Sequence, residues 1–312
     1  MCEHVPVMVK EAVEWLACSP GETFVDCTVG LGGHSAAILE RIQPSGNLVA
    51  IDSDADSLKE ARERLSRWKE NVTFVRDNFR NLAEILKQVG VEQVKGILFD
   101  LGMSSAQVGT PSRGFSFCQD GPLDMRFDRR QSLTAAEIVN RYPEKEIVNI
   151  IREFGEERSA RRIAAAIVRG REKSGFDSTT ELAGIVAEVL GPRRSAIHPA
   201  TRTFQALRIA VNQEMGALQV ALPQAIMALK PGGRLVVLSY HSLEDRIVKE
   251  TFREFQKGCI CPPTFPVCRC GRSPEVEILT RKPITPSPGQ VRDNPRSRSA
   301  RMRVCERKRR NT

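Results

Sequence analysis

The first hundred residues alternate between short apolar runs and stretches in which apolar residues have helical spacing. The apolar runs occupy 23–29, 47–54, 72–79 and 95–102, and the helical patterns occupy 7–17, 34–42, 54–68 and 81–90. Asp54 is typical of a helix start, and Gly90 is typical of a helix end. Strands that alternate with helices predict right-handed βαβ units, and so a parallel sheet covered on both faces. We therefore expect an α/β fold.

The alternation stops after residue 102. Residues 102–128 are rich in Gly, Pro and Ser and predict a long ordered loop, and only helical patterns follow until a strand signal returns near residue 231. A helical stretch between two parts of one sheet predicts an inserted domain. We place the discontinuous sheet domain at 1–102 and 213–312, and the all-helical insert at 103–212. Near the end of the chain, residues 276–287 and 297–310 predict an antiparallel hairpin at the sheet edge.

The stretch TFVDCTVGLGGHS, Thr23–Ser35, places three glycines between the first strand and the next helix. Glycines there let a ligand approach the backbone, and the free N–H groups at a helix start attract anionic or polar groups. Asp52 ends the next strand, where a carboxylate accepts hydrogen bonds from the hydroxyls of a ribose. This loop therefore predicts a nucleotide-binding site, and a glycine turn that serves packing alone is the alternative.

The details of the loop favour S-adenosylmethionine over a dinucleotide. Ser35 stands where the dinucleotide fingerprint requires a glycine. S-adenosylmethionine has no pyrophosphate to bind, so it does not need that glycine. RDNF ends the third strand and offers polar and aromatic groups for adenine. LKPGGRL, residues 229–235, joins a helix to a strand in a manner common among methyltransferases.

The formal net charge of +9 resides in the last 32 residues. Residues 281–312 hold eleven Lys/Arg and two Asp/Glu, so the rest of the chain is neutral. Such a segment suits a polyanion, although a solvated tail without a partner is the alternative. No apolar run approaches the roughly 18 residues that a membrane span needs. The beginning of the chain lacks the pattern of a signal peptide. We expect a cytoplasmic protein with no membrane association.

Four of the nine cysteines are clustered, with the spacing C-x-C-x6-C-x-C: Cys259, Cys261, Cys268 and Cys270. Four thiols could bind a tetrahedral zinc, although C-x-C is tighter than the usual C-x-x-C arrangement. Free thiols in a surface loop are the alternative, and a reducing compartment disfavours disulfides. The sequence alone leaves this choice open, so no metal ligand is assigned.

Several stretches, which together cover nearly the whole chain, are specific in combination for one family of proteins. Among them are HVPVM, DCTVGLGGHS, IDSDADSL, DLGMSSAQV, TRTFQALRIAVNQE, LKPGGRLVVLSYHSLEDR and NPRSRSARMRV. With these the chain resembles the small-subunit rRNA cytosine-N4 methyltransferases called RsmH or MraW. The resemblance implies a class I (Rossmann-like) methyltransferase sheet with an inserted helical domain for substrate recognition. It implies S-adenosylmethionine as donor and a P-site cytidine of 16S rRNA, within the small ribosomal subunit, as acceptor. No obligate protein partner is inferred.

The resemblance also assigns site residues. The positions that match the family's cofactor contacts are Gly32, Gly33, His34, Asp52, Phe79, Asp100 and Gln107. In this assignment Asp52 binds the ribose and Phe79 lies beside the adenine. Without the resemblance, His34 would be a helix-start residue and Phe79 a core aromatic.

Methylation of cytosine N4 requires positioning more than nucleophile activation, because the methyl group of the donor is already activated. Acceptors for the N4 hydrogens add electrostatic stabilisation. Asp100, at the end of the fourth strand, is the candidate catalytic residue. His241 is the second candidate acceptor and Tyr240 a stacking ring, unless both are simply a packed strand end.

Other functions on the same fold remain open at this stage. A DNA or other RNA amino-methyltransferase is one alternative, since fold does not determine substrate. A non-catalytic ribosome-assembly factor is another. RNA contacts are expected from Arg161, Arg162 and Arg169 in the insert. In the basic tail they are expected from Arg296, Arg298, Arg301 and Arg303.

Overall fold

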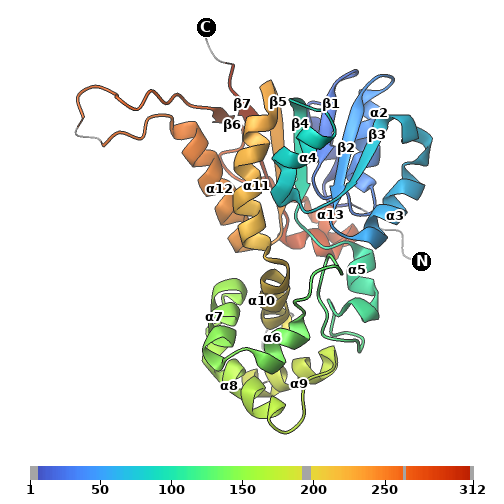
Figure 1. Ribbon diagram of the computed structural model, residues 1–312, viewed down its shortest axis with the longest axis vertical. Helices are drawn as coiled ribbons and strands as arrows, with labels where there is room; N and C mark the ends of the chain where they lie inside the picture. Colours follow the sequence, from blue (N-terminus) through green and yellow to red (C-terminus); the bar gives the residue numbers. More distant parts are fainter. Residues whose placement is uncertain (1–5, 192–197, 263–264, 310–312) are drawn as a thin grey trace. The chain divides into compact units, whose positions relative to one another are not determined.

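The computed structural model describes residues 6–191, 198–262 and 265–309 (Figure 1). The chain forms two compact units. The first unit comprises Met1–Gly102 and Met215–Thr312, and the second comprises Met103–Glu214. Each unit has its own hydrophobic core.

The first unit is built on a seven-stranded sheet with the strand order β3-β2-β1-β4-β5-β7-β6. Its strands are β1 (Thr23–Asp26), β2 (Asn47–Asp52), β3 (Val72–Arg76), β4 (Val94–Asp100), β5 (Leu229–Ser239), β6 (Val276–Ile278) and β7 (Arg301–Arg307). The first five strands are parallel, and β7 runs antiparallel to both β5 and β6. The predicted α/β fold is confirmed. The strand order reverses between β1 and β4, and open α/β sheets bind ligands beyond the carboxyl ends at that point.

Helices cover both faces of this sheet (Figure 1). They are α1 (Val9–Leu16), α2 (Gly33–Ile42), α3 (Ala55–Arg64), α4 (Leu82–Gln88), α11 (Glu214–Ala228), α12 (Ser242–Lys257) and α13 (Pro288–Asp293). In β4, Ile97 and Phe99 face the core shared with α4 and α11, whereas Leu98 faces the core shared with α1 and α2. All three side chains are fully buried, as expected for a parallel strand covered on both sides.

The end of the chain completes the sheet as the predicted hairpin. Strand β7 pairs along β5, and β6 pairs along the outer edge of β7. Arg303 is buried, and its Nε lies 2.6 Å from Asp245 Oδ1 on α12. Arg301 Nη1 lies 3.2 Å from the other oxygen of Asp245. The expectation that Arg303 contacts RNA is therefore wrong, because its charge is used inside the protein.

The second unit is helical around a core of its own. Its helices are α5 (Ser105–Gly109), α6 (Ala135–Arg141), α7 (Glu144–Gly155), α8 (Ala160–Arg171), α9 (Thr179–Leu190) and α10 (Thr201–Asn212). The long loop that precedes α6 is ordered by side-chain hydrogen bonds. Asn212 Nδ2 donates to Met125 O at 2.8 Å, and Asn212 Oδ1 accepts the N–H of Phe127 at 2.7 Å. One difference from prediction is α5, a short helix within the predicted loop, which Ser104 caps.

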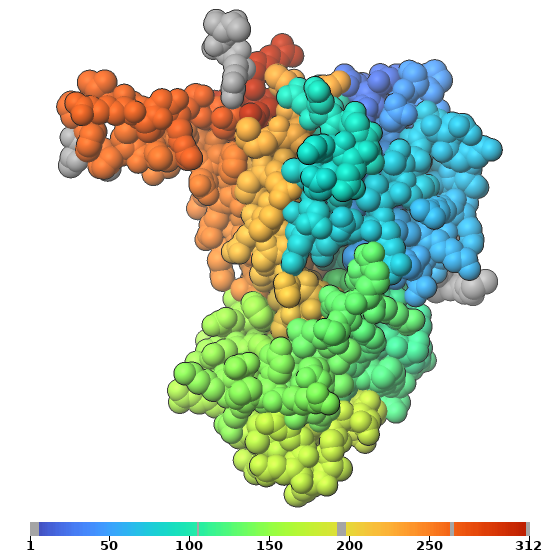
Figure 2. Space-filling view, in the orientation of Figure 1, coloured from blue at the N-terminus to red at the C-terminus, as the bar shows by residue number. Residues whose placement is uncertain are grey.

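Two further observations concern the surface. Figure 2 shows the segment between α12 and β6 projecting away from the sheet. Within the described ranges, no helix has both the length and the apolar character that crossing a membrane requires.

Candidate active site

The glycine loop connects β1 to α2 and contains two residues in the left-handed region. Gly30 has φ +51° and Gly32 has φ +78°, a region that side chains other than glycine rarely adopt. Gly33 has a different reason to be glycine, because an added Cβ would lie 2.1 Å from Pro6 Cγ. At Gly30 an added Cβ would meet only the Thr28 carbonyl, at 3.8 Å. A ligand therefore has room at Gly30, which the sequence-based assignment did not include.

Helix α2 begins at Gly33, with Gly32 as its N-cap. The first N–H groups of a helix have no intrahelical acceptor, so this turn offers donors to a carboxylate or phosphate. Gly32 N–H itself donates to Val29 O at 2.7 Å, which closes the turn.

Asp52 ends β2 beside this loop, and the backbone fixes its carboxylate. Oδ2 accepts the N–H of Gly30 and Oδ1 accepts the N–H of Asp54, each at 2.9 Å. The surrounding protein desolvates the group and raises the pKa of Asp52 to about 6, although the two N–H groups oppose the shift. The carboxylate is half-buried, so its remaining lone pairs are available to a ligand.

Asp26 and Ser35 form a pair that sequence reasoning missed. Asp26 is buried at the end of β1, and its Oδ2 accepts the Ser35 hydroxyl at 2.7 Å. Its Oδ1 accepts the N–H of Thr28 at 3.1 Å. Burial raises the pKa of Asp26. The pair holds α2 to β1. The sequence feature that could have predicted it is Ser35, which stands where the dinucleotide-binding fingerprint has glycine.

Asp100 lies at the end of β4 within a small polar cluster. The Tyr240 hydroxyl, just after β5, donates to Asp100 Oδ1 at 2.6 Å. His34 Nδ1 lies 3.5 Å from Asp100 Oδ2, and His34 Nε2 donates to Val7 O at 2.9 Å. The Asp100 side chain is about 21% exposed, whereas His34 is buried. The Tyr240 hydroxyl therefore holds one oxygen of Asp100, and His34, which binds the segment before α1 through Nε2, lies beside the other.

Tyr240 packs its ring against Gly102, where an added Cβ would come within 2.8 Å of the ring. Burial and the neighbouring charge of Asp100 raise the pKa of Tyr240 well above its usual value. The hydroxyl thus stays protonated and donates to the carboxylate. Sequence analysis named Tyr240 as a stacking ring and missed this hydrogen bond.

His241 is the N-cap of α12. Its Nδ1 accepts the N–H of Glu244 at 3.4 Å, and its Nε2 lies 3.1 Å from Glu244 Oε1. Nδ1 is used by the helix cap, whereas the buried Nε2 has no hydrogen-bond partner among the described residues. The role of His241 as a proton acceptor stays a prediction.

Phe79 begins a single helical turn after β3. Its ring packs edge-on against Phe99, with the ring centroids 5.5 Å apart, and the residue is half-buried. Asp77 N–H donates to Asp52 O at 3.1 Å, which joins the end of β3 to the end of β2. Phe79 therefore combines a core contact with an exposed part that a planar ligand could cover.

Gln107 belongs to the second unit. It is buried, and its Oε1 accepts the N–H of Ser104 at 3.0 Å in the capping box of α5. Its side chain thus has a structural role at the start of that helix. A contact to the cofactor stays a prediction.

The strand order with an antiparallel seventh strand, the glycine loop and the acids at successive strand ends define a class I, Rossmann-like methyltransferase, which uses S-adenosylmethionine. A family model described as the MraW methylase family matches residues 1–308. The chain belongs to this family.

Curated relatives match this chain over most of their length. A protein of Symbiobacterium thermophilum named ribosomal RNA small subunit methyltransferase H is 50% identical over 303 residues, covering 96% of this chain and 95% of that one. One of the same name from Dehalococcoides mccartyi is 52% identical, covering 97% of this chain and 86% of that one. Among solved structures, an rRNA methylase from Streptococcus thermophilus is 12% identical with a TM-score of 0.42, too distant to argue from.

Proposed function

We propose that this methyltransferase transfers a methyl group to the N4 amino group of a P-site cytidine in 16S rRNA, within the small ribosomal subunit. The names of the relatives support ribosomal RNA of the small subunit as the substrate class. The observation that carries the proposal is the paired Asp100 and Tyr240 at the ends of β4 and β5, next to the glycine loop. Acting there would place the enzyme in the cytoplasm with the ribosome.

The residues of the first unit fit S-adenosylmethionine. Asp52 is held by two backbone N–H groups and would accept the ribose hydroxyls. Phe79 would cover the adenine with its exposed part. The first turn of α2 would bind the methionine carboxylate through the backbone N–H groups of Gly33 and His34, and Gly32, whose own N–H donates to Val29 O, would let the ligand approach the turn. When bound, the cofactor supplies a methyl group that is already activated on a sulfonium.

Asp100 would accept a hydrogen bond from the reacting amine or from the amino group of the donor. In either role its orientation is set by the Tyr240 hydroxyl on one oxygen, with His34 beside the other. A fixed acceptor costs no reorganisation when positive charge develops on N4. The target base would have to leave its stack to reach such a site.

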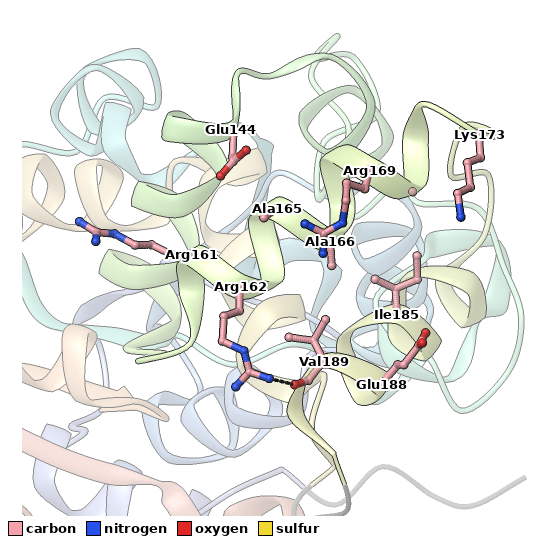
Figure 3. A pocket seen from close by; sticks show the side chains of 11 residues that line it. Glu144, Arg161, Arg162, Ala165, Ala166, Arg169, Lys173, Ile185, Glu188 and Val189 are labelled. Carbon is pink, nitrogen blue, oxygen red and sulfur yellow. Dashed lines mark hydrogen bonds between the residues drawn. The ribbon is translucent and has the colours of Figure 1, made fainter.

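The second unit supplies a basic surface for RNA. A hollow of about 750 Å³ lies between α8 and α9, and Figure 3 shows its lining. Arg161, Arg162, Arg169 and Lys173 are exposed around a floor that includes Ala165 and Ala166. Arg162 Nη2 donates to Val189 O at 2.7 Å, whereas Glu144 and Glu188 are the acids of the lining (Figure 3). Arginines in such a hollow suit phosphates of a folded RNA.

Methyl transfer to three substrates tests the proposal. Radiolabelled donor is supplied with naked 16S rRNA, small ribosomal subunits or duplex DNA, and the product is digested to nucleosides for mass spectrometry. We expect N4-methylcytidine from the ribosomal substrate and none from DNA. Label in DNA would support the alternative amino-methyltransferase, and no label in any substrate, with the donor bound, would support an assembly factor.

The RNA surface has a separate test. Changing Arg161 and Arg169 together to Gln should lower the magnitude of the slope of log affinity against log salt by about 1.4–1.8, since each lost phosphate contact accounts for roughly 0.7–0.9. Changing Arg141 and Arg152, on α6 and α7 and outside the hollow, provides the matched control. An unaltered slope would remove this surface from the interface.

A further inference from the structure

The four clustered cysteines come together in the segment between α12 and β6. Their sulfur atoms all lie within 4.8 Å of one another. Cys259 Sγ lies 3.4 Å from Cys268 Sγ, and Cys268 Sγ lies 3.5 Å from Cys270 Sγ. The separation between Cys259 Sγ and Cys270 Sγ is 3.8 Å.

These separations match a metal tetrahedron. Four sulfurs at about 2.3 Å from a zinc ion stand roughly 3.8 Å from one another. A disulfide would require about 2.05 Å, and all four cysteines are free. The sulfurs are therefore too far apart to be bonded and close enough to share one ion.

The backbone around the sulfurs has a reciprocal pattern. Ile260, between the first two cysteines, donates its N–H to Cys270 Sγ at 3.5 Å. Arg269, between the last two, donates its N–H to Cys261 Sγ at 3.3 Å. The middle residue of each C-x-C pair thus contacts the second cysteine of the other pair. N–H groups aimed at sulfur stabilise thiolates, which is the form that binds metals.

The same segment lacks another source of order. None of its described residues between Cys259 and Pro274 belongs to a hydrophobic core of either unit. Ile260, Phe265 and Val267 are exposed. At the base of the segment, Glu275 N–H donates to Phe255 O at 2.9 Å, which closes the loop where it meets α12. Among the described side chains inside that closure, the four cysteines converge, and Arg269 lies over the Phe265 ring with 6.0 Å from its guanidinium carbon to the ring centroid.

We propose that Cys259, Cys261, Cys268 and Cys270 bind one structural Zn²⁺ ion. All four ligands are protein thiolates, so no coordination position is open and the ion does not act on a substrate. Each thiol releases its proton to solvent when it binds the ion. Zinc suits the site because thiolates select soft or borderline ions, and zinc has no redox chemistry in a reducing cell.

The function of the ion would be to hold the segment in one shape. The centre with zinc bound carries a net charge of −2. The backbone N–H groups offset part of this charge, and so do Arg269 and Arg272, which are close to the cysteines in sequence. With the ion in place, the exposed apolar residues and these arginines form a fixed surface beyond the sheet. This inference does not depend on the proposed RNA substrate.

Metal analysis of the full chain, purified without chelator and without a nickel column, tests the site. We expect one zinc per chain in the native protein. The double variant C268S/C270S should lose the zinc, whereas C118S, which removes an exposed cysteine of the second unit, should keep it. If the double variant does not fold, the wild-type protein provides the test instead. A thiol reagent should release its zinc, and zinc should bind again after reduction of the thiols and dialysis.

Limited proteolysis gives a readout independent of activity. Stripping zinc should expose 259–274 to cleavage while the donor affinity of the first unit is unchanged. Little zinc in the wild-type protein, with all four thiols reacting freely in the native state, would overturn the proposal. Iron in place of zinc, which would colour the protein, would also overturn the proposal. So would a molecular mass of the native protein that shows disulfide bonds between these cysteines.

Discussion

Donor binding should depend on the ionisation of Asp52 near pH 6. Its carboxylate already accepts two backbone N–H groups, and burial raises its pKa to about 6. Ribose hydroxyls donate to the ionised form, whereas a protonated carboxyl has lost part of its acceptor capacity. The donor therefore binds the ionised form preferentially. Its affinity should reach a plateau above pH 7 and should fall as the pH decreases through 6.

The size of the effect follows from that pKa. At pH 5 about one carboxyl in eleven is ionised, so the donor should bind roughly tenfold more weakly than on the plateau. Replacing Asp52 by Asn removes the charge at every pH. Hydrogen bonds to a charged group contribute about 1.5–3 kcal/mol, which corresponds to a 10- to 150-fold loss of affinity.

Calorimetric titration with S-adenosylmethionine between pH 5 and 8 measures both effects. The donor's carboxylate titrates well below this window and its α-amino group, with a pKa of about 7.7–8.0, titrates at the top of it, so the effect of Asp52 is determined between pH 5 and 7. Glu60→Gln, which neutralises an exposed acid on α3, is the matched control and should retain the wild-type profile. A wild-type affinity that does not change between pH 5 and 7, or an Asp52→Asn variant with normal affinity, would refute the assignment.

Three further outcomes are expected. Tyr240→Phe should slow single-turnover methyl transfer about tenfold or more while the fold is kept, because Asp100 loses its 2.6 Å hydrogen bond from the Tyr240 hydroxyl. Tyr142→Phe is the control. Ser35→Ala should lower the free energy of unfolding by about 1–3 kcal/mol in urea, since buried Asp26 loses a donor. Arg303→Ala should cost roughly 3–5 kcal/mol of stability and leave the salt dependence of RNA binding unchanged; a changed slope would contradict the strand role.

The sheet could be predicted from the sequence because its signals are local. Apolar runs, the Asp54 cap and Gly90 mark where each element begins or ends, and the handedness of βαβ units then leaves few topologies. The helix α5 could not be predicted in the same way. Its residues lie in a stretch rich in Gly and Ser, and although Ser104 and Gln107 have the S-x-x-Q spacing of a capping box, no run with helical apolar spacing follows them to indicate a helix.

The candidate site was predictable in its positions but not in its contacts. Asp52 and Asp100 follow from their places at strand ends. The pairing of Asp100 with Tyr240, however, joins residues 140 positions apart, and no local pattern reports it. The same holds for His34, whose buried ring connects Asp100 to Val7. Long-range side-chain partners depend on the packing of the sheet, which a linear pattern does not contain.

The distribution of charge shows why net charge is a weak guide to a binding surface. The charge of the basic tail suggested RNA contacts from all four of its named arginines, yet β7 turns Arg303 and Arg307 toward the protein. Arg303 pairs with Asp245, and Arg307 Nη2 lies 2.7 Å from Glu275 Oε2. Although burial opposes it, Arg303 holds the pKa of Asp245 below its usual value. Because the folded pKa is depressed, the stability from this pair is present at neutral pH and is lost as the pH falls below about 4.

The charge that remains available to RNA is therefore only part of the charge that the sequence assigned to it. Arg296 and Arg298 are still exposed ahead of β7. Exposed cations also line the hollow of the second unit, and a smaller hollow of about 380 Å³ beside α12 includes Lys249 and Arg253. The hollow of the second unit lies outside the last 32 residues, whereas the smaller one also includes Arg281 and Arg303 of that segment. In the hollow of the second unit, Arg161, Arg162, Arg169 and Lys173 outnumber the acids Glu144 and Glu188, so the neutral total of residues 1–280 hides a local excess of cations.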